Sequence, residues 1–478
     1  MTTKTKFGRS LSEGKLLAQS RSCRETLNTV LCASFAAKRP ADRTISSIFR
    51  ANRHYGSRDR QIISEGVFGV FRWWGILRKL LPSRLLQDIE KVLLSLPDDG
   101  KGSFLKMPDE VLDMLLLGAF ILEKREIPEL CVIWANELGV DLKNFLNFTR
   151  NKSQLTDEEF YSCTLDFLNR DKTSSASITA KDLLPEWIWD KMPEKTKAGE
   201  LVKWFQIRPP IWIRAQTVSP DELIKKLSSE GITAQRHPKI ENAIKIENAK
   251  VNLYTLESFK KGMFEIQDLA SQSIGLVCAP EGGERWWDTC AGAGGKSLQL
   301  SDMMKGKGSV LATDIREYKL EDLRKRAKRA RCSNIICNSW DGKGLRKKKQ
   351  GKFDGVLVDA PCTCSGTWRR NPDARWNLAP EEIKDFSDMQ LKILRNAASG
   401  VKPGGVLVYA TCSFFQEENS AVAKSFLDGN SNFEFDTFLN PLTGEKCEGM
   451  LSIYPHEGNC DAMFAARFRR KKVDQDMS

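Results

Sequence analysis

The amino-terminal third of the chain carries the apolar spacing of helices. Between residues 23 and 140, apolar side chains recur every three or four positions, as on the buried face of an amphipathic helix. The clearest run comprises Ile62, Ile63, Val67, Val70, Phe71, Trp74 and Leu77. A second run follows the helix-starting pair Pro108 and Asp109 and comprises Val111, Leu112, Leu115, Leu116, Ala119 and Phe120. We therefore expect an all-helical domain over residues 1–150.

The pattern changes after residue 150. Residues 151–177 are polar and serine-rich, which is typical of a linker, and we expect linker and connecting helices over residues 151–204. Apolar and polar positions then alternate behind Pro209 and Pro210, which indicates the start of a strand. The sequence thus predicts a small α/β module, like an RNA-recognition motif (RRM), over residues 205–261.

Beyond residue 262, short apolar strands alternate with turns and helices. We place strands at residues 285–289, 309–313, 353–358 and 405–410. This alternation predicts a doubly wound, Rossmann-like α/β domain over residues 262–472, followed by a tail at 473–478. In such a sheet, ligands bind beyond the carboxyl ends of the strands, so the residues that follow each strand are the candidates for chemistry.

Composition narrows the possible partners. The chain has 478 residues with 41% hydrophobic and 28% charged residues, which fits a multidomain globular protein. The chain has 74 Lys and Arg residues and 62 Asp and Glu residues, so its net charge is +12. This charge favours nucleic acid as a binding partner, although a basic surface that only contacts solvent gives the same net charge. No apolar run approaches the roughly 20 residues that span a bilayer, and the first 14 residues lack a signal-peptide core. We expect a cytoplasmic protein.

The 13 cysteines are expected to be reduced thiols. Disulfides are typical of small secreted domains, and this chain is large and has no secretory signal. It has no paired Cys-x-x-Cys motif, and its only histidines are His54, His237 and His456. The sequence therefore predicts no metal site.

A glycine-rich turn opens a helix behind the strand at 285–289. Its residues are Cys290, Ala291, Gly292, Ala293, Gly294, Gly295 and Lys296. Glycines allow a ligand to approach the backbone closely, and a helix amino terminus offers free N–H donors. A plain strand-to-helix turn also uses glycine, but the glycine spacing excludes a phosphate-binding P-loop.

Acidic residues follow the next strands along the same sheet edge. Asp314 directly follows the strand at 309–313, where dinucleotide-binding folds hold ribose hydroxyls, although a lone aspartate also serves as a helix cap. Asp341 and Asp359 follow the next two expected strands. A row of carboxylates at one edge favours a nucleoside-like ligand.

Two cysteines follow neighbouring strands. Cys362 lies just beyond Asp359, and Cys412 lies beyond the strand at 405–410. A thiolate beside a nucleoside site supplies what cytosine methylation needs, because carbon 5 of cytosine becomes nucleophilic only after carbon 6 has been attacked. Any single cysteine can equally be an inert buried residue.

Basic residues concentrate in the same domain. One predicted helix carries Arg324, Lys325, Arg326, Lys328, Arg329 and Arg331, and Lys347, Lys348 and Lys349 follow. These helix residues can also form a solvated face. The loop behind Cys362 contains Arg369, Arg370, Arg375 and Trp376, and guanidinium groups beside an indole favour RNA binding.

Over nearly its whole length, the chain resembles the RsmB/Sun (Fmu) family of RNA cytosine-5 methyltransferases. The resemblance rests on segments in family order: residues 267–272 (QDLASQ), 290–296 (CAGAGGK), 359–362 (DAPC), 369–373 (RRNPD), 411–413 (TCS), and Glu418 with Asn419. Residues 58–60 and 65–72 resemble the NusB-like RNA-binding domain of the ribosomal branch, which favours small-subunit (16S) rRNA as substrate.

The resemblance implies a class I methyltransferase domain that uses S-adenosylmethionine. The turn at 290–296 is expected to hold the methionine part, Asp314 the ribose and Asp341 the adenine region. Cys412 is expected to attack carbon 6, and Cys362 to help remove the proton and release the product. Asp359 is expected to face the target base, with Lys296 as an electrostatic helper. The sequence departs from the family at residues 291–293, which replace the usual Ala-Ala-Pro, and at the additional thiol of Cys364.

Three alternatives remain at this point. A tRNA methyltransferase would use the same chemistry. A DNA cytosine methyltransferase would use the Pro-Cys cysteine, Cys362, as its nucleophile. A non-catalytic RNA-binding assembly factor is the third possibility, and the presence of Cys362, Cys412 and Asp359 argues against it.

Overall fold

The computed structural model describes residues 11–82, 85–86, 106–151, 155–169, 178–193, 198–248 and 252–472. Residues 1–10, 170–177 and 473–478 lie outside this set. They include most of the segment from which we expected no signal peptide, the serine-rich part of the linker, and the tail. Among the described residues, no helix is long and apolar enough to cross a membrane. The chain forms two compact units, one made of Met1–Lys191, Thr196–Ile207 and Trp368–Leu378, the other of the remaining residues.

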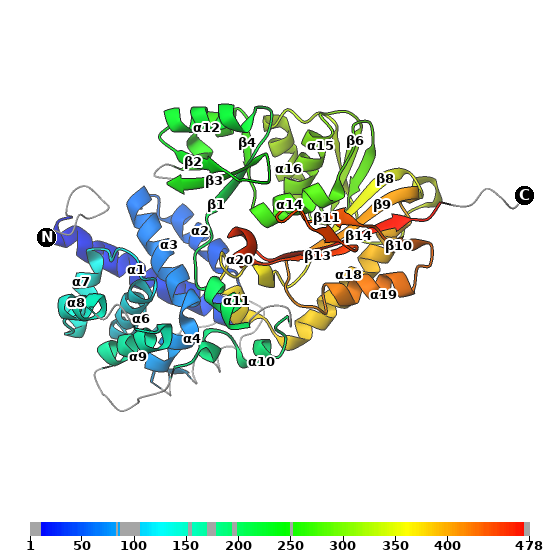
Figure 1. Cartoon of the computed structure of the whole chain (residues 1–478). Coiled ribbons are helices and arrows are strands. Elements are labelled where there is room, and N and C mark those ends of the chain that lie inside the picture. The colour runs from blue at the N-terminus through cyan, green and yellow to red at the C-terminus, as the bar shows by residue number, and fades with distance from the viewer. Residues whose placement is uncertain are drawn as a thin grey trace, which may run out of the picture. The chain divides into compact units, whose positions relative to one another are not determined.

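The first unit is helical (Figure 1). Its main helices are α1 (Glu13–Ala37), α2 (Ala41–Ala51), α3 (Ser57–Arg72), α4 (Trp74–Leu77), α6 (Asp109–Leu122), α7 (Leu130–Leu138), α8 (Leu142–Asn151), α9 (Asp157–Leu168), α10 (Glu186–Trp189), α11 (Ala198–Phe205) and α17 (Ala374–Asn377). Helix α6 begins at Asp109 as predicted. The expected helical domain is confirmed, and it is consistent with a NusB-like fold. Helix α9 falls inside the stretch interpreted as linker, where Thr156 caps it by accepting a hydrogen bond from the Glu159 N–H.

The second unit begins with a four-stranded antiparallel sheet in the order β2-β3-β1-β4. Its elements are β1 (Ile211–Ala215), α12 (Pro220–Ser229), β2 (Thr233–Arg236), β3 (Ala243–Asn248), α13 (Glu257–Lys260) and β4 (Phe264–Ile266). Apolar residues of both helices pack on one face of the sheet, around Ile213, Ile244 and Phe264. The opposite face of the sheet carries Trp212 of β1 and Ala243 of β3. These two residues pack in the same core as helix α14 (Leu269–Cys278). This arrangement confirms the small α/β module, and its sheet extends beyond the expected end at residue 261 to include β4.

The rest of the unit is the expected doubly wound domain. Strands β5 (Arg285–Asp288), β6 (Ser309–Asp314), β7 (Ile335–Ser339), β8 (Phe353–Asp359) and β9 (Val401–Thr411) are parallel. The sheet order is β7-β6-β5-β8-β9-β14-β10, in which β14 (Met463–Arg470) lies antiparallel to β9 and also pairs with β13 (Met450–Ile453) and β10 (Phe433–Phe435). Two short strands, β11 (Phe438–Leu439) and β12 (Lys446–Cys447), pair separately, and α20 (Pro455–Gly458) precedes β14.

Helices cover both faces of this sheet (Figure 1). Helices α14, α15 (Gly295–Met303) and α16 (Glu317–Arg329) lie on one face, and α18 (Pro380–Ala398) and α19 (Ser420–Asp428) on the other. The neighbours Trp286 and Trp287 on β5 are buried in the two opposite cores, because successive residues of a strand face opposite sides. Both faces are therefore dry, and the polar residues gather beyond the strand ends.

Gly355 on β8 provides a test of this packing. It lies opposite Trp286 on β5, and a Cβ atom there would lie 2.2 Å from the indole ring. We expect Gly355→Ala to destabilise the protein by about 1–3 kcal/mol through overpacking, and Trp286→Phe in the same chain to recover part of this loss. Urea unfolding followed by circular dichroism measures both effects. The control is Gly282→Ala, whose Cβ meets nothing closer than 3.7 Å; equal losses at Gly355 and Gly282 would contradict the packing.

Candidate active site

The two predicted cysteines meet at the carboxyl ends of neighbouring parallel strands. Strand β8 ends at Asp359 and β9 at Thr411, so Cys362 and Cys412 both lie just beyond the sheet. The Ala360 N–H still donates to the Ala410 carbonyl at 2.9 Å, which holds the two strand ends together. The sulfur atoms of Cys362 and Cys412 lie 3.4 Å apart. The sequence placed these thiols at one sheet edge, and the structure brings them into contact.

Asp359 and Lys296 form an ion pair beside the thiols. The Lys296 ammonium donates to Asp359 Oδ2 at 2.8 Å, and the lysine side chain is 10% exposed. Burial alone would lower the pKa of Lys296, but the charge of Asp359 and the nearby Cys412 thiol reverse this and leave the pKa raised. The lysine is therefore a fixed positive charge next to Cys412.

The pKa values of the Cys362 and Cys412 thiols are both raised in this arrangement. Hydrogen bonds with Cys364 and Cys412, together with burial, raise the pKa of Cys362 well above its usual value. The contact with Cys362 lowers the pKa of Cys412, but the contact with Cys364, burial and the charge of Asp359 outweigh it and raise the pKa overall. A thiolate at Cys412 requires additional positive charge or a change in these contacts.

Glu418 ties the two cysteine-bearing loops together. It is fully buried, and its Oε1 accepts hydrogen bonds from the Thr363 N–H and the Gln390 side chain, both at 2.9 Å. Its Oε2 accepts from the hydroxyls of Thr363 at 2.6 Å and Ser413 at 2.5 Å. Thr363 follows Cys362 and Ser413 follows Cys412, so one carboxylate positions both thiols. The sequence offered Glu418 only as part of a family motif, with no role.

Neighbouring contacts complete this support. The Gln390 side chain of α18 also donates to the Pro361 carbonyl at 2.9 Å, and the Gly366 N–H donates to the Cys412 carbonyl at 2.9 Å. Asn419 accepts from the Thr411 hydroxyl and donates to the Ser413 carbonyl. These residues contact the loops around the thiols, so their role is to fix the loop conformation.

The glycine-rich turn lies beside this pair of loops. Gly292 and Gly294 have positive φ angles of 53° and 86°, and a Cβ at Gly294 would lie 2.4 Å from Leu323 of α16. Only glycine fits such a position without displacing the helix. The backbone from Ala291 to Lys296 thus forms a tight cradle between β5 and α15.

Asp314 is bonded to this cradle. Its Oδ2 accepts from the Gly292 N–H at 2.9 Å, and the Arg316 backbone and guanidinium donate to its two oxygens. Burial alone would raise the pKa of Asp314, but the hydrogen bonds from Arg316 and Gly292 leave it lowered, so the carboxylate is ionised. The next residue, Ile315, is 68% exposed and offers an apolar surface that the sequence analysis did not identify.

The cradle fits a ligand that carries positive charge. Asp288 at the end of β5 is buried, and its Oδ2 accepts from the Ser297 hydroxyl at 2.6 Å while its Oδ1 has no hydrogen-bond partner. Burial raises the pKa of Asp288 to about 7. S-adenosylmethionine carries an ammonium and a sulfonium group, and such cations offset the unfavourable burial of this carboxylate.

The small α/β module contacts the cradle through Arg326. The Arg326 guanidinium donates to the Ala293 carbonyl at 2.8 Å and to Glu265 Oε2 on β4 at 2.8 and 3.1 Å. Arg329 also pairs with Glu265, which is 1% exposed. Two residues of the basic run on α16 therefore serve an internal ion-pair network, whereas Arg324, Lys325, Lys328 and Arg331 are exposed.

Other predicted site residues lie elsewhere. Asp341, just beyond β7, is exposed and pairs with Lys343 at 2.8 Å. The loop residues predicted to bind RNA belong to the helical unit. Arg369 and Arg375 are fully buried there, and Arg375 donates to the carbonyls of Leu183, Phe205 and Pro372. Their predicted contact with RNA is corrected to an internal structural role, because a buried guanidinium bonded to backbone is closed to a ligand. Trp376 is half-buried and donates to the Phe71 carbonyl, and Arg370 is half-buried.

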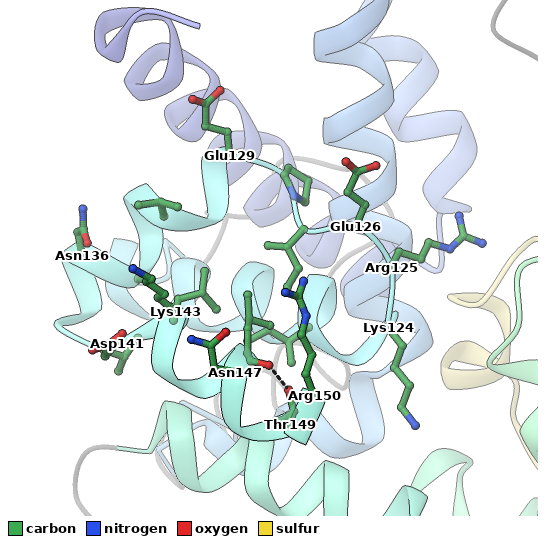
Figure 2. Close-up of a pocket in the computed structure, with 18 of the residues that line it drawn as sticks. Lys124, Arg125, Glu126, Glu129, Asn136, Asp141, Lys143, Asn147, Thr149 and Arg150 are labelled. Atoms are coloured by element: carbon green, nitrogen blue, oxygen red, sulfur yellow. Dashed lines mark hydrogen bonds between the residues drawn. The ribbon is translucent and has the colours of Figure 1, made fainter. Parts of the chain in front are cut away.

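The helical unit contains a cavity of about 1400 Å³ that is unrelated to this chemistry (Figure 2). It is lined by the segment between α6 and α7 and by α8. Its labelled side chains are of both charges, with Lys124, Lys143 and Arg150 beside Glu126 and Asp141. None of the predicted site residues lines it.

Family models match two parts of the chain. The model described as 16S rRNA methyltransferase RsmB/F matches residues 275–469, which contain every residue of the thiol pair and the cradle. The ferredoxin-like domain of RsmF/B-like methyltransferases matches residues 184–252. Residues 275–469 and 184–252 thus match the methyltransferase and ferredoxin-like domains of the RsmB/F methyltransferases. These matches confirm the predicted fold, the dependence on S-adenosylmethionine and RNA as the class of substrate.

Individual relatives agree with this family. A protein of Photorhabdus laumondii named ribosomal RNA small subunit methyltransferase B is 28% identical over 87% of this chain and 91% of its own length. A Bacillus subtilis protein named as a probable enzyme of the same kind is 31% identical, over 60% of this chain and 66% of its own length. The solved structure of PH0851 has a TM-score of 0.70 at 22% identity and covers 94% of this chain and 99% of its own, which shows a shared fold.

The support around Glu418 yields one prediction. In Glu418→Gln, the amide NH2 group replaces one carboxylate oxygen and faces hydrogen-bond donors. At least one buried hydrogen bond is therefore lost, which lowers the free energy of unfolding by about 1–3 kcal/mol. We expect kcat to fall at least ~10-fold, with a smaller change in the KM for RNA, and the reaction of Cys362 and Cys412 with a thiol reagent to accelerate. Glu434→Gln, at an exposed position of β10, is the control. Unchanged kcat and thiol reactivity would contradict the role of Glu418.

The Arg326 contact yields a second prediction. A lysine ammonium cannot bridge Glu265 and the Ala293 carbonyl as the guanidinium does. We expect Arg326→Lys to weaken the binding of S-adenosylmethionine about tenfold, the equivalent of about 1.4 kcal/mol, without a comparable change in the KM for RNA. Isothermal titration calorimetry measures the dissociation constant. Arg324→Lys on the same helix, where Arg324 is exposed and pairs with Glu317, should bind the cofactor normally.

Proposed function

We propose that the chain methylates carbon 5 of a cytosine in small-subunit rRNA, with Cys412 as the covalent nucleophile. The observation that carries this proposal is the pair of thiols 3.4 Å apart at the ends of β8 and β9. They lie next to the Asp359–Lys296 ion pair, and the same lysine belongs to the helix that the glycine-rich turn opens. Two cysteines in one nucleoside site match a reaction that needs both a nucleophile and a proton acceptor.

The roles of the thiols follow from the chemistry of the ring. The Cys412 thiolate attacks carbon 6, and the electron pair of the 5,6 double bond becomes available at carbon 5. Bound S-adenosylmethionine supplies the methyl group that carbon 5 takes. Cys362, which has released its own proton to solvent, then takes the proton from carbon 5 as a thiolate. The electron pair of the C–H bond re-forms the double bond, and the Cys412 thiolate leaves carbon 6 with the electron pair of the S–C bond. The thiolate is thereby regenerated.

Lys296 and Asp359 stabilise the charges of this reaction. The buried ammonium of Lys296 lies close enough to Cys412 to favour its thiolate. Asp359 lies between the cradle and the thiols and contacts the base near nitrogen 3, where charge develops during the attack. The Lys296 side chain is buried, and a buried charge has a stronger effect on its neighbours.

Cofactor binding is assigned to the cradle and its neighbours. The methionine part is bound by the backbone of residues 290–296 and by Asp288. Asp314 binds the ribose, whose hydroxyls replace the half-exposed Arg316 guanidinium as its hydrogen-bond partner. Ile315 contacts the adenine, with Asp341 at its rim. The exposed bases Arg324, Lys325, Lys328 and Arg331, together with Lys347–Lys349, supply phosphate contacts.

Small-subunit rRNA is proposed over tRNA on two grounds. The amino-terminal unit is helical and consistent with a NusB-like fold, and the curated relatives carry the name of small-subunit rRNA enzymes. A tRNA substrate is a separate outcome of the test below.

The decisive experiment is the transfer of labelled methyl groups to unmodified small-subunit rRNA and, separately, to tRNA. We expect wild type to label carbon 5 of cytosine in rRNA. Cys412→Ala should be inactive, and Cys362→Ala should lose about 100-fold or more in turnover, the usual contribution of a general base, and accumulate an RNA–protein adduct. The adduct is detected by denaturing gel electrophoresis.

Cys163→Ser, in helix α9 of the other unit, is the matched control and should methylate normally. Full activity of Cys412→Ala would refute the nucleophile. An adduct that forms through Cys362 would indicate the mechanism of DNA cytosine methyltransferases. Labelling of tRNA alone would preserve the chemistry and refute the substrate.

A further inference from the structure

A third thiol lies beside the catalytic pair. The sulfur atoms of Cys362, Cys364 and Cys412 all lie within 4.8 Å of one another. Cys362 is buried, Cys412 half-buried and Cys364 exposed. Cys364 has no role in the proposed methyl transfer, so the cluster contains one more soft ligand than that reaction uses.

The spacing of the three sulfurs fits one soft metal ion. A tetrahedral Zn²⁺ ion binds thiolates at about 2.3 Å, which places two sulfurs on one ion roughly 3.8 Å apart. The Cys362–Cys412 separation of 3.4 Å is slightly shorter, and the remaining separations are bounded by 4.8 Å. Small side-chain rotations therefore suffice. The fourth position, on the side of the exposed Cys364, is open to water, as in a three-ligand zinc site.

The backbone at Cys364 is unusual in a way that serves the cluster. Its φ angle is 56°, a left-handed conformation that residues with a Cβ rarely adopt. This turn brings Cys364 back beside Cys362, to whose carbonyl its thiol donates at 3.4 Å. The Thr367 N–H and hydroxyl both donate to the Cys364 carbonyl and hold the turn. Cys364 combines an unfavourable backbone conformation with a metal-binding sulfur, and this combination supports a metal site more strongly than either feature alone.

The local charge also suits a thiolate-bound divalent ion. Three thiolates and one Zn²⁺ leave a net charge of −1 in place of the −3 of three thiolates alone, and the Lys296 ammonium, which pairs with Asp359, lies beside Cys412. Each sulfur–zinc bond replaces a sulfur–hydrogen bond, and the three protons pass to solvent, so no oxidant or reductant is involved.

We propose that Cys362, Cys364 and Cys412 form a binding site for a soft divalent ion of the Zn²⁺ class, and that the bound ion and RNA methylation exclude each other. Metal binding itself does not depend on the proposed function; the mutual exclusion does, because it requires that both catalytic thiols be metal ligands. The sequence analysis predicted no metal site because it looked for metal-ligand spacing along the chain. The proposed site instead combines cysteines from two separate loops.

The first test measures metal binding without RNA or cofactor. Full-length protein, reduced with a phosphine and kept free of oxygen, is titrated with ZnCl2 against a chromophoric chelator. We expect one tight site in wild type and in Cys163→Ser, affinity that rises with pH because thiols must lose protons, and at least tenfold weaker binding in Cys364→Ser. Titration with Co²⁺ reports sulfur ligands directly through thiolate-to-cobalt absorption bands, also in wild type, so the test does not depend on the folding of a variant.

The second test measures methylation in the presence of zinc. Cys364→Ser, compared with its own zinc-free rate, should resist ZnCl2 at concentrations that stop wild type. Equal zinc affinity of wild type and Cys364→Ser, or cobalt spectra without thiolate bands, would overturn the site. Tight three-thiol binding with undiminished methylation would leave the metal site standing and refute the exclusion, together with the proposed use of these thiols in catalysis.

Discussion

The buried carboxylate of Glu418 is the interaction on which the active site depends. Parallel strands bring β8 and β9 side by side, but the chain beyond each strand end is free to diverge. Glu418 prevents this by accepting hydrogen bonds from Thr363 and Ser413, one residue beyond each cysteine. A carboxylate that is fully buried is tolerated only when its oxygens are satisfied. The two loops are therefore fixed relative to each other, with the sulfur atoms of Cys362 and Cys412 in contact.

A second set of contacts joins this conformation to the cofactor cradle. Lys296 belongs to the helix that begins at the glycine-rich turn and reaches Asp359 at the end of β8. Arg326 connects the same turn to Glu265 of the small α/β module. The module is thus part of the support for the cradle, in addition to any surface it offers to RNA. The Arg326–Glu265 ion pair lies at β4, an edge strand of the module's sheet.

The sequence predicted the parts of the site that depend on local structure. Asp314, Asp359, Cys362 and Cys412 lie at or just beyond strand ends, as expected, because strand ends are visible in the apolar pattern and parallel strands end at one edge. Their chemical roles stay predictions. The roles of Arg326, Arg369 and Arg375 could not be predicted, because a buried arginine and a surface arginine look alike until their distant partners are known. Glu418 escaped assignment for the same reason: its donors come from three separate segments.

The proximity of the thiols has a chemical consequence. Two sulfurs in contact cannot both carry a full negative charge without strong repulsion, so the resting pair shares its protons and stays unreactive. In the proposed mechanism, attack by Cys412 therefore depends on the positive charge of Lys296 and of the bound sulfonium cofactor, whose cradle adjoins the thiols. Since the attacking sulfur becomes neutral when it bonds to carbon 6, Cys362 is then free to ionise. In the proposed mechanism the ring itself requires attack before proton removal, and the electrostatics of two adjacent thiols agree with that order.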